Sequence, residues 1–160
     1  MFGRRKIAAL VAEFLGAGVL TIVILNVMYG AIHYSLFTAA AAGLALMVMS
    51  YVVGEVSGGY FNPAITLGQW VVGKVQTLSA ILYIAVELLG AWLAYYLFTY
   101  IVANHPNTIG GHYTTHILVA EAVGTAVLSF AFTALAYKGL TRGVTAAYYG
   151  ISYIVASTAV

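Results

Sequence analysis

Long apolar stretches separated by short polar breaks run through the chain from end to end. Five of them are long enough to cross a bilayer as helices, since about 20 residues span its hydrocarbon core. They cover about residues 7–28, 36–53, 77–103, 117–137 and 143–160, and polar breaks lie at 29–35, 55–76, 104–116 and 138–142. The pattern predicts an all-α membrane protein with one transmembrane domain over residues 1–160.

Composition supports a membrane environment. The 160 residues are 63% hydrophobic and 6% charged, whereas a soluble domain has about 25% charged residues. Cysteine is absent from the sequence, which excludes disulfides and thiolate metal sites. The first apolar stretch is longer than the core of a cleaved signal peptide, so we interpret it as a retained helix. We expect no cofactor, no metal and no nucleic-acid partner.

The basic residues predict the orientation in the membrane. With five alternating helices, all six fall on one side: Arg4, Arg5, Lys6, Lys74, Lys138 and Arg142. Basic loops mark the cytoplasmic face, so we expect a cytoplasmic N-terminus, in the plasma membrane. The four histidines fall on the other side: His33, His105, His112 and His116. Metal binding or pH sensing is open to them, but solvated loop histidines are the simpler interpretation.

The chain repeats itself. The segment AEFLGAGVLT from Ala12 resembles AEAVGTAVLS from Ala120, at an offset of 108 residues, and each copy carries a glutamate in its second position. Three helices separate the copies, so they cross the membrane in opposite directions, as in transport proteins built from inverted repeats. The first repeat covers about 7–103, and the second begins at about 117 and is incomplete at 160. The small residues Ala12 and Gly16 predict a close contact between helices.

The segment SGGYFNPAITLG at residues 57–68 is the most informative motif. Asn62 is a strong N-cap and Pro63 suits a first helical position, so a helix is expected from Pro63 to about Gly73. About ten residues give about 15 Å of helix, half of a bilayer. Glycine-rich chain precedes this helix, and irregular backbone at membrane depth must line a cavity or be buried in protein. The segment therefore predicts a re-entrant half-helix, with an interfacial loop helix as the alternative.

This motif resembles the first Asn-Pro-Ala box of the aquaporin and glycerol-facilitator family, and AEFLG and AEAVGTAVLSF resemble its two glutamate-bearing helices. The resemblance covers essentially the whole chain and implies an aquaporin-like inverted-repeat bundle, of which five of six spanning helices are present. It also implies a homotetramer in the lipid bilayer that conducts water or small neutral solutes, and no enzymatic activity.

The resemblance implies roles for the motif residues. Asn62, in the box Asn62-Pro63-Ala64, would present amide donors to the pore beside the positive end of the half-helix, which repels cations. The carbonyls of Gly58, Gly59 and Tyr60 would line the cytoplasmic vestibule as acceptors.

All four acidic residues are glutamates in or beside apolar segments, where a carboxylate needs partners. By resemblance, Glu13 and Glu121 would accept hydrogen bonds from re-entrant backbone. Glu87 stands where the family usually has glutamine, and Glu55 where water-selective members often have histidine. The roles of these two stay open.

By the same resemblance, the selectivity filter would take one residue from the second helix and one from the fifth, here Ala42 and Ser157. These small side chains predict a wide opening that passes glycerol-sized solutes, unless the remaining filter residues narrow it. The repeat offset places a second box near residue 169 or 170, beyond Val160, so we expect a fragment of a longer protein. A naturally short chain that completes its pore by assembly is the alternative.

Three functions compete at this level. They are a passive channel, a proton-coupled transporter that uses the membrane glutamates, and a structural junction protein. A membrane enzyme is disfavoured, since no nucleophile with a base appears within the spans.

Overall fold

The computed structural model describes residues 3–30, 35–102 and 114–158, and this part of the chain is built from helices without strands. His33, His105 and His112 lie outside the described residues. Six helices follow one another along the chain: α1 (Arg4–Met28), α2 (Ser35–Ser57), α3 (Pro63–Val71), α4 (Thr77–Ile101), α5 (Thr115–Leu135) and α6 (Arg142–Thr158). The expected half-helix is present as α3, and the five expected long helices are present with ends within a few residues of the prediction.

The protein is an integral, multi-pass membrane protein. Among the described residues, α1, α2, α4 and α5 are long and apolar enough to cross a membrane. Helix α6 has 17 residues, at the lower end of the length that spans a bilayer. Large apolar side chains cover the outside of the bundle: Trp92 is 63% exposed, Phe130 75% and Tyr100 80%. Such a surface suits lipid and would be costly in water.

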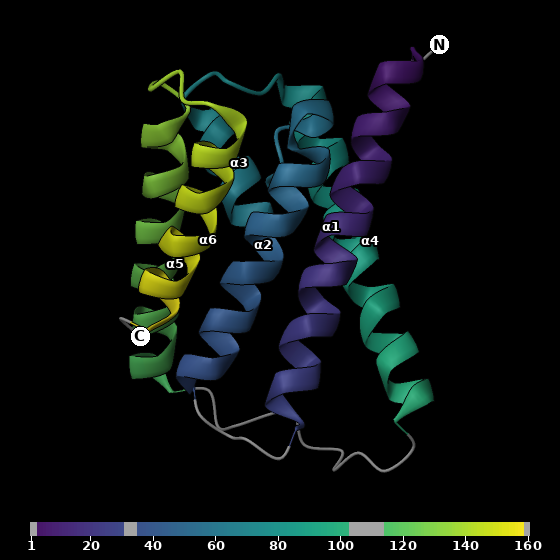
Figure 1. Cartoon of the computed structure of the whole chain (residues 1–160), viewed down its shortest axis with the longest axis vertical. Helices are drawn as coiled ribbons and strands as arrows, with labels where there is room; N and C mark the ends of the chain where they lie inside the picture. Colours follow the sequence, from purple (N-terminus) through teal and green to yellow (C-terminus); the bar gives the residue numbers. More distant parts are fainter. Residues whose placement is uncertain (1–2, 31–34, 103–113, 159–160) are drawn as a thin grey trace.

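The two repeats run in opposite directions, as the sequence predicted. In Figure 1, α1 descends from the end marked N while α5 ascends toward it, and α2 and α6 are likewise antiparallel. The first residues of α1, α4 and α6 and the last residues of α2 and α5 therefore gather at the N-terminal end of the bundle. The basic residues lie in or beside these helix ends, so the chain concentrates its positive charge at one end.

Two glycine contacts hold the long helices together. Helix α2 packs against α6, and α1 packs against α4 and α2. A Cβ atom on Gly43 would lie 2.5 Å from the Gly150 carbonyl oxygen, and one on Gly150 would lie 2.5 Å from the Gly43 oxygen. A Cβ atom on Gly90 would strike the carbonyl of Phe14. Only glycine allows the backbones to approach this closely, a common device in membrane bundles.

The interior of the bundle carries several fully buried polar groups. Glu13 and Thr66 are 0% exposed, and Gln69 and Glu87 are 1% exposed. An apolar cluster that includes Leu46, Ile65 and Phe132 surrounds the short helix α3. Buried polar groups need hydrogen-bond partners, and these groups mark the part of the molecule where chemistry is concentrated.

Candidate functional site

The short helix α3 begins at the cap that its sequence dictates. Asn62 has an extended backbone, and its Oδ1 accepts a hydrogen bond from the Ala64 N–H at 2.9 Å. Pro63 occupies the first helical position, where its missing N–H costs nothing. Because Oδ1 is used by the cap, the side-chain NH₂ of Asn62 is left to donate into the space beyond the helix.

Helix α3 occupies only the upper half of the bundle in Figure 1. It packs between α4 and α5. Ser129 on α5 donates from Oγ to the Ala64 carbonyl at 3.2 Å, and the Tyr137 hydroxyl donates to the Val72 carbonyl at 3.3 Å. Helix α5 and the chain that follows it thus hold both the beginning and the end of this half-helix.

The chain before Asn62 is extended and turns sharply. Gly58 and Gly59 have φ angles of 110° and 71°, a region that side chains with a Cβ rarely occupy. Phe61 also has a positive φ, 51°, which is uncommon for a bulky residue and marks a local strain that the surroundings must hold. The glycines are therefore required by the path of the backbone.

Glu13 of α1 holds this extended segment in place. Its Oε1 accepts from the Tyr60 N–H at 3.2 Å and its Oε2 accepts from the Phe61 N–H at 2.6 Å. A carboxylate that accepts backbone amides makes stronger hydrogen bonds than a neutral acceptor. Ser50 adds a weaker contact, donating to the Gly59 carbonyl at 3.3 Å. The strained backbone is thus fixed from α1 and from α2.

The Phe61 ring is a second anchor. It is 2% exposed, and it fills the space beside Gly16 of α1, where an added Cβ would overlap the ring. The sequence predicted that the small residues Ala12 and Gly16 let two helices approach. Gly16 instead makes room for a side chain from the re-entrant segment, because that segment lies between α1 and the rest of the bundle.

Thr66 of α3 and Glu87 of α4 form a buried pair. The Thr66 hydroxyl donates to Glu87 Oε1 at 2.6 Å. Within the described residues, Glu87 Oε2 and both polar atoms of the Gln69 side chain have no hydrogen-bond partner. Such groups are costly in a protein interior, so this region has unused hydrogen-bonding capacity close to the half-helix.

A cavity of about 470 Å³ lies on the far side of Asn62. Glu121 and Thr125 of α5 line it, with Tyr153 and Ser157 of α6. Glu121 is exposed there and has no hydrogen-bond partner among the described residues. The cavity therefore brings together three residues singled out in the sequence, Asn62, Glu121 and Ser157.

Ala42 does not line this cavity. It is 1% exposed and belongs to the apolar cluster with Leu20 and Leu46. Ser157, by contrast, is exposed on the cavity wall. The two filter candidates of the sequence therefore have different surroundings.

A second cavity, of about 240 Å³, lies toward the N-terminal end of the bundle. Gly58 contributes to its lining, together with Ser50 and Glu55 of α2 and Arg142 and Tyr149 of α6. Gly59 and Tyr60 are not part of this lining. The carbonyl of Gly59 accepts from Ser50, and the Tyr60 N–H is held by Glu13.

Arg142 closes one side of this second cavity. Its guanidinium donates to the carbonyls of Tyr51 and Val52, with 2.9 Å to the latter, and lies 3.4 Å from Glu55 Oε2. Arg142 is the first residue of α6 and Glu55 lies in the last turn of α2, so each charge opposes the dipole of its own helix. Each is instead favoured by the adjoining end of the other helix, so the pair stabilises the contact of α2 with α6.

Two stacked rings lie in the core of the bundle. Phe132 and Tyr149 stack with centroids 3.6 Å apart. Phe132 lies one helical turn from Leu128, which lines the larger cavity, and Tyr149 lines the smaller one. The ring pair thus belongs to the same apolar cluster as Phe61 of the extended segment.

The sequence analysis did not predict the contacts that three residues of the site make. Gly16 was noted only as a small helix residue, Arg142 only as an orientation charge, and Phe61 only as part of the motif. The repeat that contains Gly16 was a signal of its importance, but nothing in sequence shows that Phe61 would fill the space beside it.

Comparisons with known proteins agree with this architecture. The family model described as "Major intrinsic protein" matches residues 4–159. Aquaporin AqpM of Methanothermobacter thermautotrophicus is 32% identical over 124 residues, which cover 67% of this chain and 50% of that protein. Aquaporin Z of Photorhabdus laumondii is 44% identical over 54 residues, 34% of this chain and 23% of that protein. The chain thus aligns with half or less of the length of these relatives.

Proposed function

Because this chain belongs to the major intrinsic protein family, we propose that it forms a passive transmembrane channel for water and small neutral solutes. The observation that carries the proposal is the re-entrant segment. It has a strained, glycine-dependent path held by Glu13, and it ends at Asn62 with an amide donor free to face a cavity. Such a site offers hydrogen bonds to a passing solute and requires no chemical step.

The electrostatics of Asn62 favour neutral solutes. Its NH₂ group and the positive end of α3 both disfavour a cation at the same point. A water or polyol oxygen can accept from the amide there, whereas a bare cation at the amide meets the positive ends of two dipoles. On the other side, Gly58 lines the smaller cavity with Glu55 and Arg142, which supports its role in a polar vestibule.

The filter candidates define the solute proposal. Ser157 lies on the wall of the larger cavity, whereas Ala42 is buried in the apolar cluster with Leu46. With two side chains this small at the filter positions that the family resemblance implies, the channel would pass glycerol-sized solutes as well as water. In liposomes, Ala42→Phe should lower glycerol flux much more than water flux. A wild-type protein that excludes glycerol would contradict the wide opening.

The orientation and assembly complete the proposal. We place the N-terminus in the cytoplasm and the protein in the plasma membrane as a homotetramer, on the basis of the basic residues at one end and the family resemblance. The chain has no cysteine, so single cysteines at positions 115 and 138 can be labelled with an impermeant thiol reagent in intact cells. Labelling at position 138 without labelling at position 115 would contradict the proposed orientation. A native mass other than that of four chains would contradict the tetramer.

The central test is Asn62→Asp in liposomes under an osmotic gradient. A carboxylate removes the amide donor and attracts cations, so water flux should fall at least about tenfold, a loss equivalent to about 1.4 kcal/mol. Asn26→Asp is the matched control, since Asn26 is exposed on α1 and donates only to the Ile22 carbonyl. Equal fluxes in both variants would refute the role of Asn62. A wild-type flux that requires a proton gradient would favour a coupled carrier instead.

A further inference from the structure

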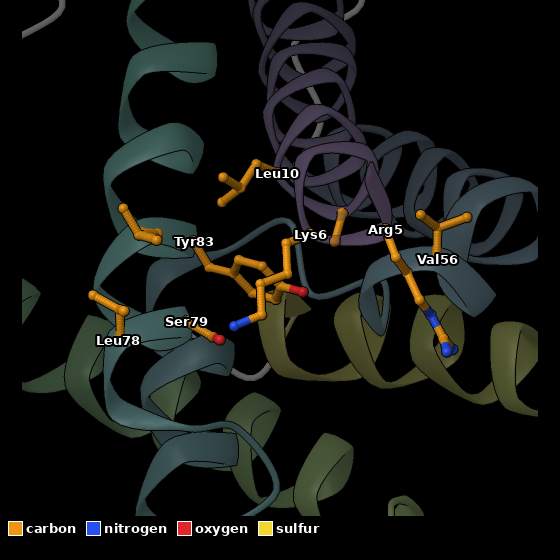
Figure 2. Close-up of a pocket in the computed structure, with 9 residues that line it drawn as sticks. Arg5, Lys6, Leu10, Val56, Leu78, Ser79 and Tyr83 are labelled. Atoms are coloured by element: carbon orange, nitrogen blue, oxygen red, sulfur yellow. The ribbon is translucent and has the colours of Figure 1, made fainter. Parts of the chain in front are cut away.

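A separate pocket lies at the N-terminal end of the bundle, between α1, α2 and α4. Its volume is about 370 Å³. Arg5 and Lys6 of α1 border it, and Ser79 and Tyr83 of α4 contribute hydroxyl groups. In Figure 2 the Lys6 and Arg5 side chains diverge, with Lys6 on the side of Ser79 and Arg5 on the side of Val56 of α2. The two cations therefore lie at different sides of one opening.

The positive charge of this pocket has no counter-charge in the described chain. The lining contains no carboxylate, because the four acidic side chains of the sequence belong to the sites described above: Glu13, Glu55, Glu87 and Glu121. Arg5 and Lys6 are both exposed and, among the described residues, form no ion pair. A ligand for this pocket should therefore be anionic.

The remaining wall of the pocket is aliphatic. It is built from Leu10, Val56, Leu78 and Leu82. The wall continues onto the outer face of the bundle, where Leu78 is 58% exposed and its neighbour on α4, Ile81, is 59% exposed. A soluble anion would leave this apolar surface uncovered, whereas a ligand with a hydrocarbon chain would cover it.

We propose that this pocket binds an anionic phospholipid. The headgroup phosphate lies between Arg5 and Lys6 and accepts a hydrogen bond from Ser79, while one acyl chain follows Leu78 and Leu82 down the side of α4. Basic pockets between membrane helices at the cytoplasmic surface bind such headgroups, with about 1 kcal/mol from each Lys or Arg. The proposal is independent of the solute that the channel conducts.

The pocket is in contact with the re-entrant segment. The Tyr83 hydroxyl, on the pocket wall, donates to the Ser57 carbonyl at 3.2 Å, and Ser57 Oγ accepts from the Gly59 N–H at 3.2 Å. A lipid that packs against Tyr83 therefore supports the beginning of the glycine segment. Binding should raise the thermal stability of the whole fold, because it favours the folded state alone.

The test is a titration of the detergent-solubilised chain with phosphatidylglycerol, with thermal unfolding as the readout. Phosphatidylcholine, which has the same chains but no net charge, is the reference lipid. Wild type should be stabilised by phosphatidylglycerol at lower concentrations than by phosphatidylcholine. Arg5→Gln and Lys6→Gln should each weaken the phosphatidylglycerol response about fivefold, and the double variant about 25-fold.

Matched controls separate this pocket from general charge attraction. Arg4→Gln removes the neighbouring charge, which does not line the pocket, and Lys138→Gln removes a charge at the same end of the bundle. Both should respond to phosphatidylglycerol as wild type does. Equal weakening in all four single variants, or no preference for phosphatidylglycerol in wild type, would overturn the proposal. Stabilisation by inorganic phosphate at the same concentrations would also overturn it, in favour of a site for a free anion.

Discussion

Glu13 and Glu121 occupy equivalent positions in the two repeats, yet their surroundings are opposite. Glu13 is 0% exposed and accepts two backbone amides from the re-entrant segment. Glu121 is exposed on the wall of the 470 Å³ cavity and has no partner among the described residues. Among the described residues, the same residue on antiparallel copies of one helix thus binds re-entrant backbone in one copy and lines a cavity in the other. A strained segment of chain covers Glu13, and no described segment covers Glu121.

The largest effect is expected where this difference is removed. Glu13→Gln leaves one of the two buried amides opposite an NH₂ group, and each unsatisfied buried donor costs about 1–3 kcal/mol. We expect a loss of about 3 kcal/mol, while Glu121→Gln should change stability by less than about 0.5 kcal/mol. Denaturant unfolding of both variants in detergent measures the contrast. Equal losses would show that Glu121 is as constrained as Glu13.

A smaller effect is expected from the glycines one turn further along. In Gly16→Ala the new methyl group meets the Phe61 ring, and overpacking of this kind costs about 1–3 kcal/mol. The equivalent residue Gly124 lines the open cavity, so Gly124→Ala should cost less. The two melting temperatures give the comparison. A larger loss of stability for Gly124→Ala would mean that the surroundings of Gly124 are packed more tightly than those of Gly16.

The smallest effect is expected at Glu87, which sharpens the comparison because this buried carboxyl group accepts a hydrogen bond from a side-chain hydroxyl, that of Thr66. Glu87→Gln keeps an acceptor for the Thr66 hydroxyl, so stability should change by less than about 1 kcal/mol and flux should be nearly unchanged. Osmotic flux in liposomes between pH 5 and 8 tests this. A collapse of transport in this variant would instead support proton relay.

The contrast also shows what sequence can and cannot reveal. The half-helix was predictable, because Asn62 and Pro63 specify a helix start by local chemistry alone. The antiparallel repeats were predictable because they follow from counting helices. The role that the family resemblance implies for Glu121, accepting hydrogen bonds from re-entrant backbone, stays a prediction. The repeat relates Glu121 to Glu13 in sequence, but it does not show which groups surround each carboxyl group.

Contacts between elements that are far apart in the sequence could not be predicted from the sequence either. Arg142 was counted as a loop charge, but it reaches two carbonyls and a carboxylate on α2, about 90 residues earlier in the chain. Ala42 was assigned to the filter by its distance from Asn62 along the sequence, and its burial in the apolar cluster depends on how α2 is rotated against its neighbours. Helical spacing indicates a face, and packing decides what that face meets.

The bonds of Glu13 have a consequence for how the protein is made. Tyr60 follows Glu13 by 47 residues, and a ribosome adds about 5–20 residues per second. For about 2 to 9 s of synthesis, the first helix therefore exists before the amides that will satisfy its carboxyl group. During that interval an acidic group in a membrane helix costs about 3 kcal/mol, a burden that the leucines, valines and isoleucines around it must outweigh. The apolar character of α1 is in this sense a requirement of its biogenesis, met before any pore exists.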